Sequence, residues 1–217
     1  MLTRTFQMNC KILLSVFVFI SYAKSLSAQQ PVSNKQLPQG YEKEAIIALS
    51  YFPELKNTHI TFRIINAYTP LSTKPIFFSI FKKPAKRKYF ITISNQTTDK
   101  LSPILFKQLT DSAKIGVLGH ELSHVADFQN KHFFQFLHLG LKHSSKKFQD
   151  KFEFNTDKIC LQHGLGSYLL AWSVFVRNAL HIVNWRGADN INEKNEMIER
   201  YMNPGTIKNY LRQTLVK

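Results

Sequence analysis

The feature that most constrains this chain is an HExxH motif from His120 to His124, inside an apolar stretch without proline over residues 111–128. Side chains four residues apart lie on one face of an α-helix, with Cβ atoms about 5–6 Å apart. A helix over 112–128 therefore directs both imidazoles toward one point, as a shared metal ion requires. The motif predicts a helix that carries a metal site.

The predicted helix begins near Asp111, a residue type favoured at helix N-caps. It also contains Gly116 and Gly119, each of which weakens a helix by up to about 1 kcal/mol relative to alanine. Close packing or tertiary burial must compensate for these glycines. The alternative interpretation is a buried helix whose two histidines only satisfy hydrogen bonds in the core.

The residue types within the motif indicate zinc chemistry. His120 and His124 supply two nitrogen ligands, and Glu121 stands beside the metal without binding it. Zinc makes a bound water more acidic, and a neighbouring carboxylate can accept its proton as a general base. These residues predict a zinc-dependent hydrolase. A catalytic zinc site usually has three protein ligands, so a third ligand is expected downstream.

The best candidate for the third ligand is Glu153. Glu153 and Asp157 are four residues apart in a predicted helix, so both carboxylates can face the first motif. The alternatives that remain open are Asp127, although it is awkwardly placed on the same helix as the two histidines, and four other histidines. These four are His132, His138, His143 and His163.

HExxH followed by ExxxD resembles the gluzincin branch of the zinc metallopeptidases, over roughly residues 89–160. The metzincin pattern is disfavoured, because Asp127 and Asn130 occupy its glycine and histidine positions. The gluzincin resemblance implies one Zn²⁺ per chain, and it implies that Asp157 orients a ligand histidine. The implied zinc ligands are His120, His124 and Glu153, with Glu121 as the general base.

Gluzincins also place a side chain over the substrate oxyanion. His181 is our choice, because it ends an apolar helix that we expect to pack near the site. The other candidates are His163, Tyr168, Arg186 and Tyr201. The residues Tyr89–Ser94 are similar to the zincin strand along whose edge an extended peptide pairs. An ordinary sheet strand is the alternative interpretation of Tyr89–Ser94.

The N-terminus resembles a secretory signal peptide over residues 1–28. Arg4 and Lys11 precede an apolar run over 12–23, and small residues follow as far as Ala28. Cleavage near Ala28 would export the protein to the periplasm or the medium. The run is shorter than the about 20 residues of a membrane span, and an uncleaved segment would anchor the protein to a membrane.

The remaining chain fits one domain. Residues 29–40 are polar and contain prolines, which predicts a flexible lead-in, and residues 41–217 are expected to form a single zincin-like metallopeptidase domain. Periodicity predicts an α+β fold, in which a small antiparallel sheet precedes a mainly helical zincin-like part with the HExxH helix. The expected strands are 59–65, 75–81 and 88–94. The expected helices are 41–51, 103–110, 112–128, 131–143, 148–162, 167–183, 190–202 and 205–214.

Basic residues dominate the charge. Lysine and arginine total 29 against 14 aspartate and glutamate residues, giving a net charge of +15. The densest cluster, residues 82–88, is interpreted as a solvated hairpin loop, with attraction to an anionic envelope surface or to acidic substrates as the functional alternative. No nucleic-acid motif accompanies the charge, so no nucleic-acid partner is expected. Cys160 lies in an apolar helix and is expected to be a buried, inert thiol.

The sequence therefore predicts an exported zinc metallopeptidase that hydrolyses peptide bonds in a peptide or protein substrate, with Glu121 as its base. The alternative is a non-catalytic envelope protein, either a zinc-stabilised binding module or a basic binding protein without zinc. In that case Glu121 would have no role as a base.

Overall fold

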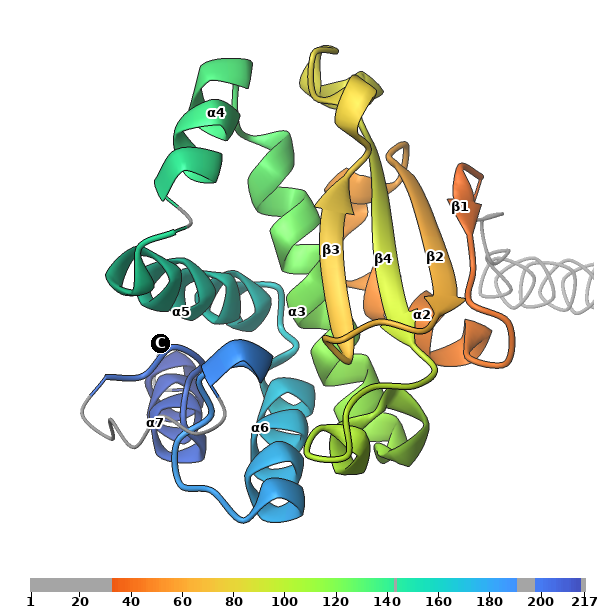
Figure 1. Ribbon diagram of the computed structural model, residues 1–217. Helices are drawn as coiled ribbons and strands as arrows, with labels where there is room; N and C mark the ends of the chain where they lie inside the picture. Colours follow the sequence, from red (N-terminus) through yellow and green to blue (C-terminus); the bar gives the residue numbers. More distant parts are fainter. Residues whose placement is uncertain (1–32, 143, 191–197, 216–217) are drawn as a thin grey trace, which may run out of the picture. The chain divides into compact units, whose positions relative to one another are not determined.

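The computed structural model describes residues 33–142, 144–190 and 198–215 (Figure 1). The predicted signal peptide and the first residues of the predicted lead-in lie outside these ranges. The chain from Asn34 onward forms one compact unit. None of the helices within the described ranges has both the length and the hydropathy needed to cross a membrane.

A small mixed sheet lies on one side of the unit, with its strands in the order β1-β2-β4-β3 (Figure 1). The strands are β1 (Lys35–Gln36), β2 (His59–Ile65), β3 (Leu71–Pro75) and β4 (Lys88–Ser94). β1 pairs with β2 and β2 with β4 in parallel, and only β3 and β4 are antiparallel. The expected α+β class is confirmed, but the expected antiparallel sheet is wrong. After β2 the chain crosses to the far side of the position of β4, forms β3 there and returns through a hairpin to form β4. The periodicity of single strands does not predict such a crossing.

Two expectations about this sheet need correction. The strand expected over 75–81 instead occupies Leu71–Pro75 and is followed by a 3₁₀ turn at Phe77–Ser79. The chain turns away from the sheet after Pro75, and Phe77 and Phe78 are exposed. The lead-in is also partly ordered into the sheet, because Lys35 and Gln36 pair with β2.

Six helices fall within the described residues, and most lie within a few residues of their predicted limits. They are α2 (Glu42–Ser50), α3 (Asp111–Gln129), α4 (Phe133–Lys142), α5 (Lys146–Gln162), α6 (Gly166–Leu180) and α7 (Pro204–Leu215). The helix expected over 103–110 is instead two 3₁₀ turns, Ser102–Ile104 and Phe106–Gln108. Leu105 between them has extended backbone angles (φ −58°, ψ 146°), which prevents one continuous helix.

The helix expected over 190–202 is not found in its described C-terminal part, residues 198–202. This segment makes hydrogen bonds to side chains of α5 instead of helical hydrogen bonds. The Met202 N–H donates to Asp157 Oδ2 at 2.7 Å, and Arg200 Nε donates to Asp150 Oδ1 at 2.7 Å. The segment therefore follows the surface of α5.

α3 is the central element of the unit, packed between the sheet and helices α2, α5 and α6. Its N-cap is Thr110, whose hydroxyl accepts from the Ala113 N–H, so the expected Asp111 cap is wrong by one residue. A Cβ added to Gly116 would lie 2.1 Å from the Tyr168 carbonyl oxygen on α6. The close packing that the two glycines implied is thus present, and α6, the apolar helix before His181, packs against α3 as expected.

The basic 82–88 segment is solvated except at one position. Its lysines are exposed, but Arg87 is only 1% exposed. The Arg87 guanidinium donates to the carbonyl oxygens of Phe128 at 3.1 Å and Lys131 at 2.5 Å. It therefore caps the C-terminal end of α3, where backbone carbonyls lack helical partners.

Candidate metal centre

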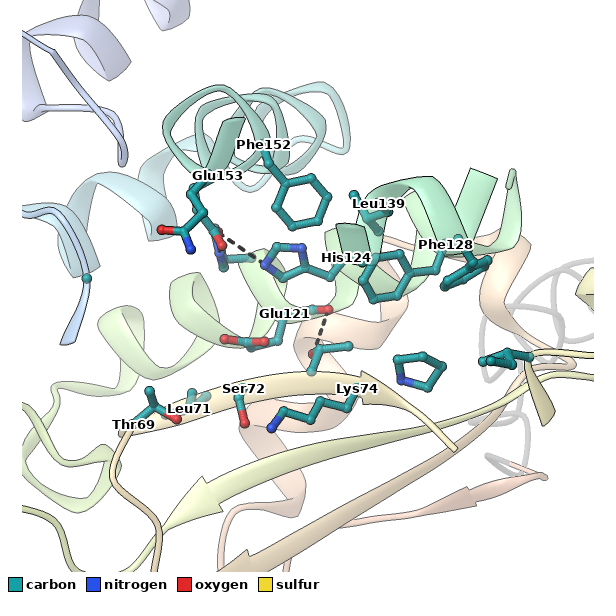
Figure 2. Close-up of a pocket in the computed structure, with 18 of the residues that line it drawn as sticks. Thr69, Leu71, Ser72, Lys74, Glu121, His124, Phe128, Leu139, Phe152 and Glu153 are labelled. Atoms are coloured by element: carbon teal, nitrogen blue, oxygen red, sulfur yellow. Dashed lines mark hydrogen bonds and ion pairs between the residues drawn. The ribbon is translucent and has the colours of Figure 1, made fainter. Parts of the chain in front are cut away.

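Three of the predicted ligands meet between α3 and α5. The ligand atoms of His120, His124 and Glu153 all lie within 4.8 Å of one another. Glu153 Oε2 is 3.1 Å from His120 Nε2 and 3.3 Å from His124 Nε2 (Figure 2). Two imidazoles come from α3 and one carboxylate from the later helix α5, as the spacing of the motifs predicts. This group could hold a metal ion.

Packing holds both imidazoles in place. His120 is 2% exposed, and its ring lies 5.6 Å from the ring of Trp172 on α6 and 5.4 Å from that of Tyr201. His124 is 7% exposed and stacks on Phe152, with 5.1 Å between ring centres. Such restraint reduces the entropy that the side chains would lose on binding a metal.

The other nitrogen of each imidazole is also engaged. Asp157 Oδ1 lies 2.7 Å from His120 Nδ1, while its Oδ2 accepts from the Met202 N–H. His124 Nδ1 lies 3.3 Å from the Thr156 hydroxyl, which itself donates to a backbone carbonyl. Both Nδ1 atoms are therefore best assigned as donors, which directs both Nε2 atoms at Glu153 and leaves them as the metal-binding nitrogens once they carry no proton. Hydrogen bonds of this kind fix the tautomer of metal-binding histidines.

The charges of this group are strongly coupled. Burial by itself would lower the pKa of His120, but hydrogen bonds to the carboxylates of Asp157 and Glu153 outweigh it and raise that pKa well above its usual value. Burial would raise the pKa of Glu153, but the charge of His124 and hydrogen bonds from both imidazoles hold it far below its usual range. Glu153 is therefore ionised, as a ligand for a cation must be.

Glu121 lies beside this group without joining it. Its side chain lines the cavity, and its Oε2 atom is buried without a hydrogen-bond partner in the part of the chain that the structure describes. An unpaired buried carboxylate oxygen is costly, so a ligand or water at this position would satisfy it. The Glu121 carbonyl accepts from the Thr73 hydroxyl at 3.1 Å, which joins α3 to β3 (Figure 2).

The site opens into a cavity of about 950 Å³. Figure 2 shows residues of β3 along one wall, with His124, Glu153 and Phe152 opposite them. Aromatic side chains from α4 and from the connection after β3 also line the cavity, together with residues 187–189, Arg200 and Tyr201. The cavity is large enough for several amino-acid side chains, and its polar lining includes Glu121 and the two histidines.

The donor set fits zinc. Two imidazole nitrogens and one carboxylate oxygen form a common protein ligand set for a catalytic zinc, which leaves a coordination position open. The convergence of the three ligands, the fixed tautomers and the unpaired Glu121 oxygen all agree with this assignment. We therefore expect His120, His124 and Glu153 to hold the ion.

The rival third ligands lie elsewhere. Asp127 forms an ion pair with Lys131, and His132 and His138 are exposed. His163 Nε2 lies 2.8 Å from Glu54 Oε1, to which it can donate a hydrogen bond, and the His163 ring stacks on Phe52. The remaining rival, His143, lies outside the described residues.

The structure does not bring His181 to the site. His181 is exposed at the left-handed C-cap of α6 (φ 54°) and does not line the cavity. The part of α6 that contacts the site is around Trp172, and His181 follows it by nine residues, about 13 Å along a helix. Helical periodicity identified the apolar helix but not which of its turns faces α3.

Among the other oxyanion candidates, Tyr201 is the one that lines the cavity. Tyr168 packs against Tyr51, and Arg186 binds Asp150 through both carboxylate oxygens at 2.9 Å. Burial and the nearby carboxylates of Glu153, Glu121 and Asp157 raise the pKa of Tyr201 well above its usual value, so its hydroxyl keeps its proton.

Sequence reasoning missed Thr156 and Trp172 as contacts of the ligand histidines. Thr156 directly precedes Asp157 and lies three residues after Glu153, so the face of the ExxxD helix could have suggested it. No feature of the neighbouring sequence indicates that Trp172 contacts a ligand histidine.

Comparisons with protein-family models, with curated proteins and with solved structures found no match to this chain.

Proposed function

We propose that this protein is a zinc-dependent metallopeptidase of gluzincin type that hydrolyses peptide bonds. The observation that carries the proposal is the convergence of His120, His124 and Glu153 beside the unpaired carboxylate oxygen of Glu121. Three ligands and a separate base, at one end of a cavity, are the parts that such hydrolysis requires.

The base is assigned to Glu121. Zinc bound in such a site supplies a Lewis acid that polarises a carbonyl and acidifies water. Glu121 takes the proton of the attacking water and then delivers it to the nitrogen of the leaving amine. Asp157 and Thr156 keep the two imidazoles in the ligand tautomer throughout.

Tyr201 is assigned to the developing oxyanion. Because its pKa is raised, the Tyr201 hydroxyl remains a hydrogen-bond donor, and it belongs to the cavity lining next to His120. A preorganised donor of this kind stabilises negative charge that appears only in the transition state. Tyr201 thus takes the role that the sequence-based prediction gave to His181.

An extended substrate is assigned to the edge of β3. Since β4 lies between β2 and β3, Tyr89–Ser94 is an ordinary inner strand, which is the alternative interpretation given above, and the edge strand is β3. The Ile76 N–H donates to the Lys88 carbonyl, and the Ser94 N–H donates to the Pro70 carbonyl. By the alternation of an antiparallel ladder, the backbone groups of Leu71 and Thr73 point away from β4. They are available to a peptide that adds as a further strand.

The setting of the reaction is a further part of the proposal. The signal-peptide pattern of residues 1–28 supports action outside the cytoplasm. The non-catalytic alternative, a zinc-stabilised envelope protein, would use the same three ligands but would not need Glu121.

Exchange of Glu121 for glutamine tests the proposal. Glu121→Gln keeps the size of the side chain and removes the base, so we expect unchanged zinc content and a loss of hydrolysis of at least about 100-fold. Glu42→Gln on the exposed face of α2 is the matched control and should keep full activity. Zinc content is measured by elemental mass spectrometry and hydrolysis with a broad set of unfolded polypeptides.

Two results would contradict the proposal. Equal hydrolysis by Glu121→Gln and the parent chain, at normal zinc content, would remove Glu121 as the base. Zinc binding without hydrolysis of any polypeptide by the parent would instead favour the non-catalytic alternative.

A further inference from the structure

Six large apolar side chains are exposed at the end of the unit where α4 and the β3–β4 connection project, at the top of Figure 1. Their exposed fractions run from 53% for Leu137 to 79% for Phe78 and Phe134. Water-exposed apolar groups gathered in one place indicate an interaction surface. We call this set the apolar tip: Phe77, Phe78, Phe81, Phe134, Leu137 and Leu141.

Ring contacts make the apolar tip continuous across the two segments. Phe81 from the connection lies 5.1 Å from Phe133 of α4, measured between ring centres, and Phe133 lies 5.6 Å from Phe134. Phe77 contacts both Phe78 and Phe81. Within α4, none of the described residues is buried, although the helix is rich in phenylalanine and leucine. The helix thus keeps an apolar face that its own fold does not cover.

The two segments that carry the apolar tip contain basic but no acidic residues. The sequence contains no aspartate or glutamate over 76–88 or over 131–149. Asp127 nearby is already paired with Lys131. The exposed cations that flank the tip are Lys82, Lys83, Lys86, Lys88, Lys142, Lys146 and Lys147.

We propose that the apolar tip docks the protein onto an anionic lipid bilayer. Phenylalanine and leucine side chains enter the boundary between headgroups and acyl chains, while the flanking lysines contact lipid phosphates. Both halves of this surface match that partner, because a bilayer offers an apolar layer directly beneath a layer of negative charge.

Other partners fit these observations less well. In a symmetric dimer through the apolar tip, the flanking lysines of the two copies would face each other without acidic partners. A peptide bound in the cavity would leave Phe78 and Phe134 exposed, because neither of them lines it. The apolar tip also borders the cavity, since Phe77, Phe81, Leu137 and Leu141 line it. Docking would therefore hold the cavity next to the membrane surface.

A fluorescent reporter at the apolar tip tests docking without using metal or hydrolysis, so its result is independent of the proposed function. Both native tryptophans, Trp172 and Trp185, are buried. In a Phe78→Trp chain, we expect brominated acyl chains to quench the added fluorescence when vesicles of phosphatidylcholine and phosphatidylglycerol are present. Val183→Trp is the matched control, because Val183 is 72% exposed and lies outside the apolar tip and the cavity. Its added fluorescence should not be quenched.

The charge contribution is tested separately in the Phe78→Trp background. Exchange of Lys82, Lys83 and Lys86 for glutamine should weaken vesicle binding by at least about tenfold, because each lysine near an anionic surface adds to the electrostatic attraction. The matched control exchanges Lys43, Lys56 and Lys208, which are exposed on other elements, and should bind as the Phe78→Trp chain does. Added salt should weaken binding of the Phe78→Trp chain.

Three results would overturn the proposal. The first is no quenching of the Phe78→Trp chain, or equal quenching of the Val183→Trp chain. The second is a blue shift of the Phe78→Trp emission with protein concentration alone, which would make the apolar tip a surface between copies. The third is a blue shift with an acidic amphipathic peptide and none with vesicles, which would make it a polypeptide-binding surface.

Discussion

Each ligand histidine is hydrogen-bonded on the side away from Glu153, and this decides what the site can bind. Asp157 and the Thr156 hydroxyl hold the two Nδ1 atoms, so both Nε2 atoms converge on the same carboxylate oxygen. Without an ion, that carboxylate is held by the two imidazoles. A divalent ion would be bound by the same nitrogen and oxygen atoms, at distances shorter than these hydrogen bonds.

Removal of Glu153 should remove the zinc. In Glu153→Ala we expect a large fall in zinc affinity. Loss of a hydrogen-bond partner of a metal ligand lowers the affinity by about 10–100-fold, and loss of the ligand itself should lower it further. Glu42→Ala, on an exposed face of α2, is the matched control. Elemental mass spectrometry after dialysis measures zinc per chain. Full zinc retention in Glu153→Ala would exclude Glu153 as a ligand.

Cys160 should be inert toward thiol reagents in the folded protein. Its side chain is fully buried, and burial together with the charge of Asp157 raises the pKa of the thiol well above its usual value. A free cysteine reacts faster as pH rises toward about 8.5, because the thiolate is the nucleophile. Alkylation of Cys160 should instead stay slow from pH 7 to 9 and become fast in denaturant. Peptide mapping by mass spectrometry measures it, and rapid alkylation in buffer would contradict the assigned burial.

At the scale of elements, α3 is positioned by contacts that only glycine permits. Gly116 brings the α3 backbone against the backbone of α6, and Gly119 faces the side chains of Leu165 and Cys160. This contact places Trp172 of α6 against His120. The close packing of α3 against α6 therefore also fixes the position of one ligand histidine.

Gly116→Ala should therefore destabilise the protein. The added Cβ would lie 2.1 Å from the Tyr168 carbonyl oxygen, so one backbone must move. We expect this movement to lower the free energy of unfolding by about 1–3 kcal/mol or more. This loss exceeds the gain of up to about 1 kcal/mol in helix propensity that alanine brings over glycine. Gly205→Ala in α7 is the matched control, since its Cβ would meet nothing within 4 Å. Urea unfolding of both chains measures the difference, and equal stability would contradict the close approach.

At the scale of the whole molecule, a buried charge cluster joins α5 to the segments after α6. Asp150 is 7% exposed and accepts from Arg186 and Arg200, which are 3% and 5% exposed. Arg200 and its neighbour Tyr201 both line the cavity, so the cluster also fixes one wall of the site.

Asp150→Asn should lower the free energy of unfolding by about 3–5 kcal/mol, because it removes the charge of a buried carboxylate that pairs with two buried guanidinium groups. Asp111→Asn is the matched control. The Asp111 side chain is 71% exposed and pairs with Lys114 at the surface, so its loss should cost less than about 1 kcal/mol. Both values come from urea unfolding, and similar values for the two chains would mean that the cluster adds no stability.

The sequence by itself determined the parts that depend on local spacing. Residues four apart on a helix must share a face, so HExxH and ExxxD could be assigned as two converging sets of side chains before any tertiary contact was known. The same periodicity located α3, α5 and α6 and the α+β class. Gly116 and Gly119 likewise predicted close packing, because packing must compensate for the loss of helix stability at each glycine.

Only the tertiary structure decided the features that join distant segments. Strand order placed β3 instead of β4 at the edge, and the mixed sheet followed from a crossing that no strand pattern records. The contact of Tyr201 with His120, and the distance of His181 from the cavity, depend on which turn of α6 meets α3 and on how Asp150 and Asp157 hold the segment before α7. Periodicity fixes directions within one element, whereas the packing of elements against one another fixes which side chains meet.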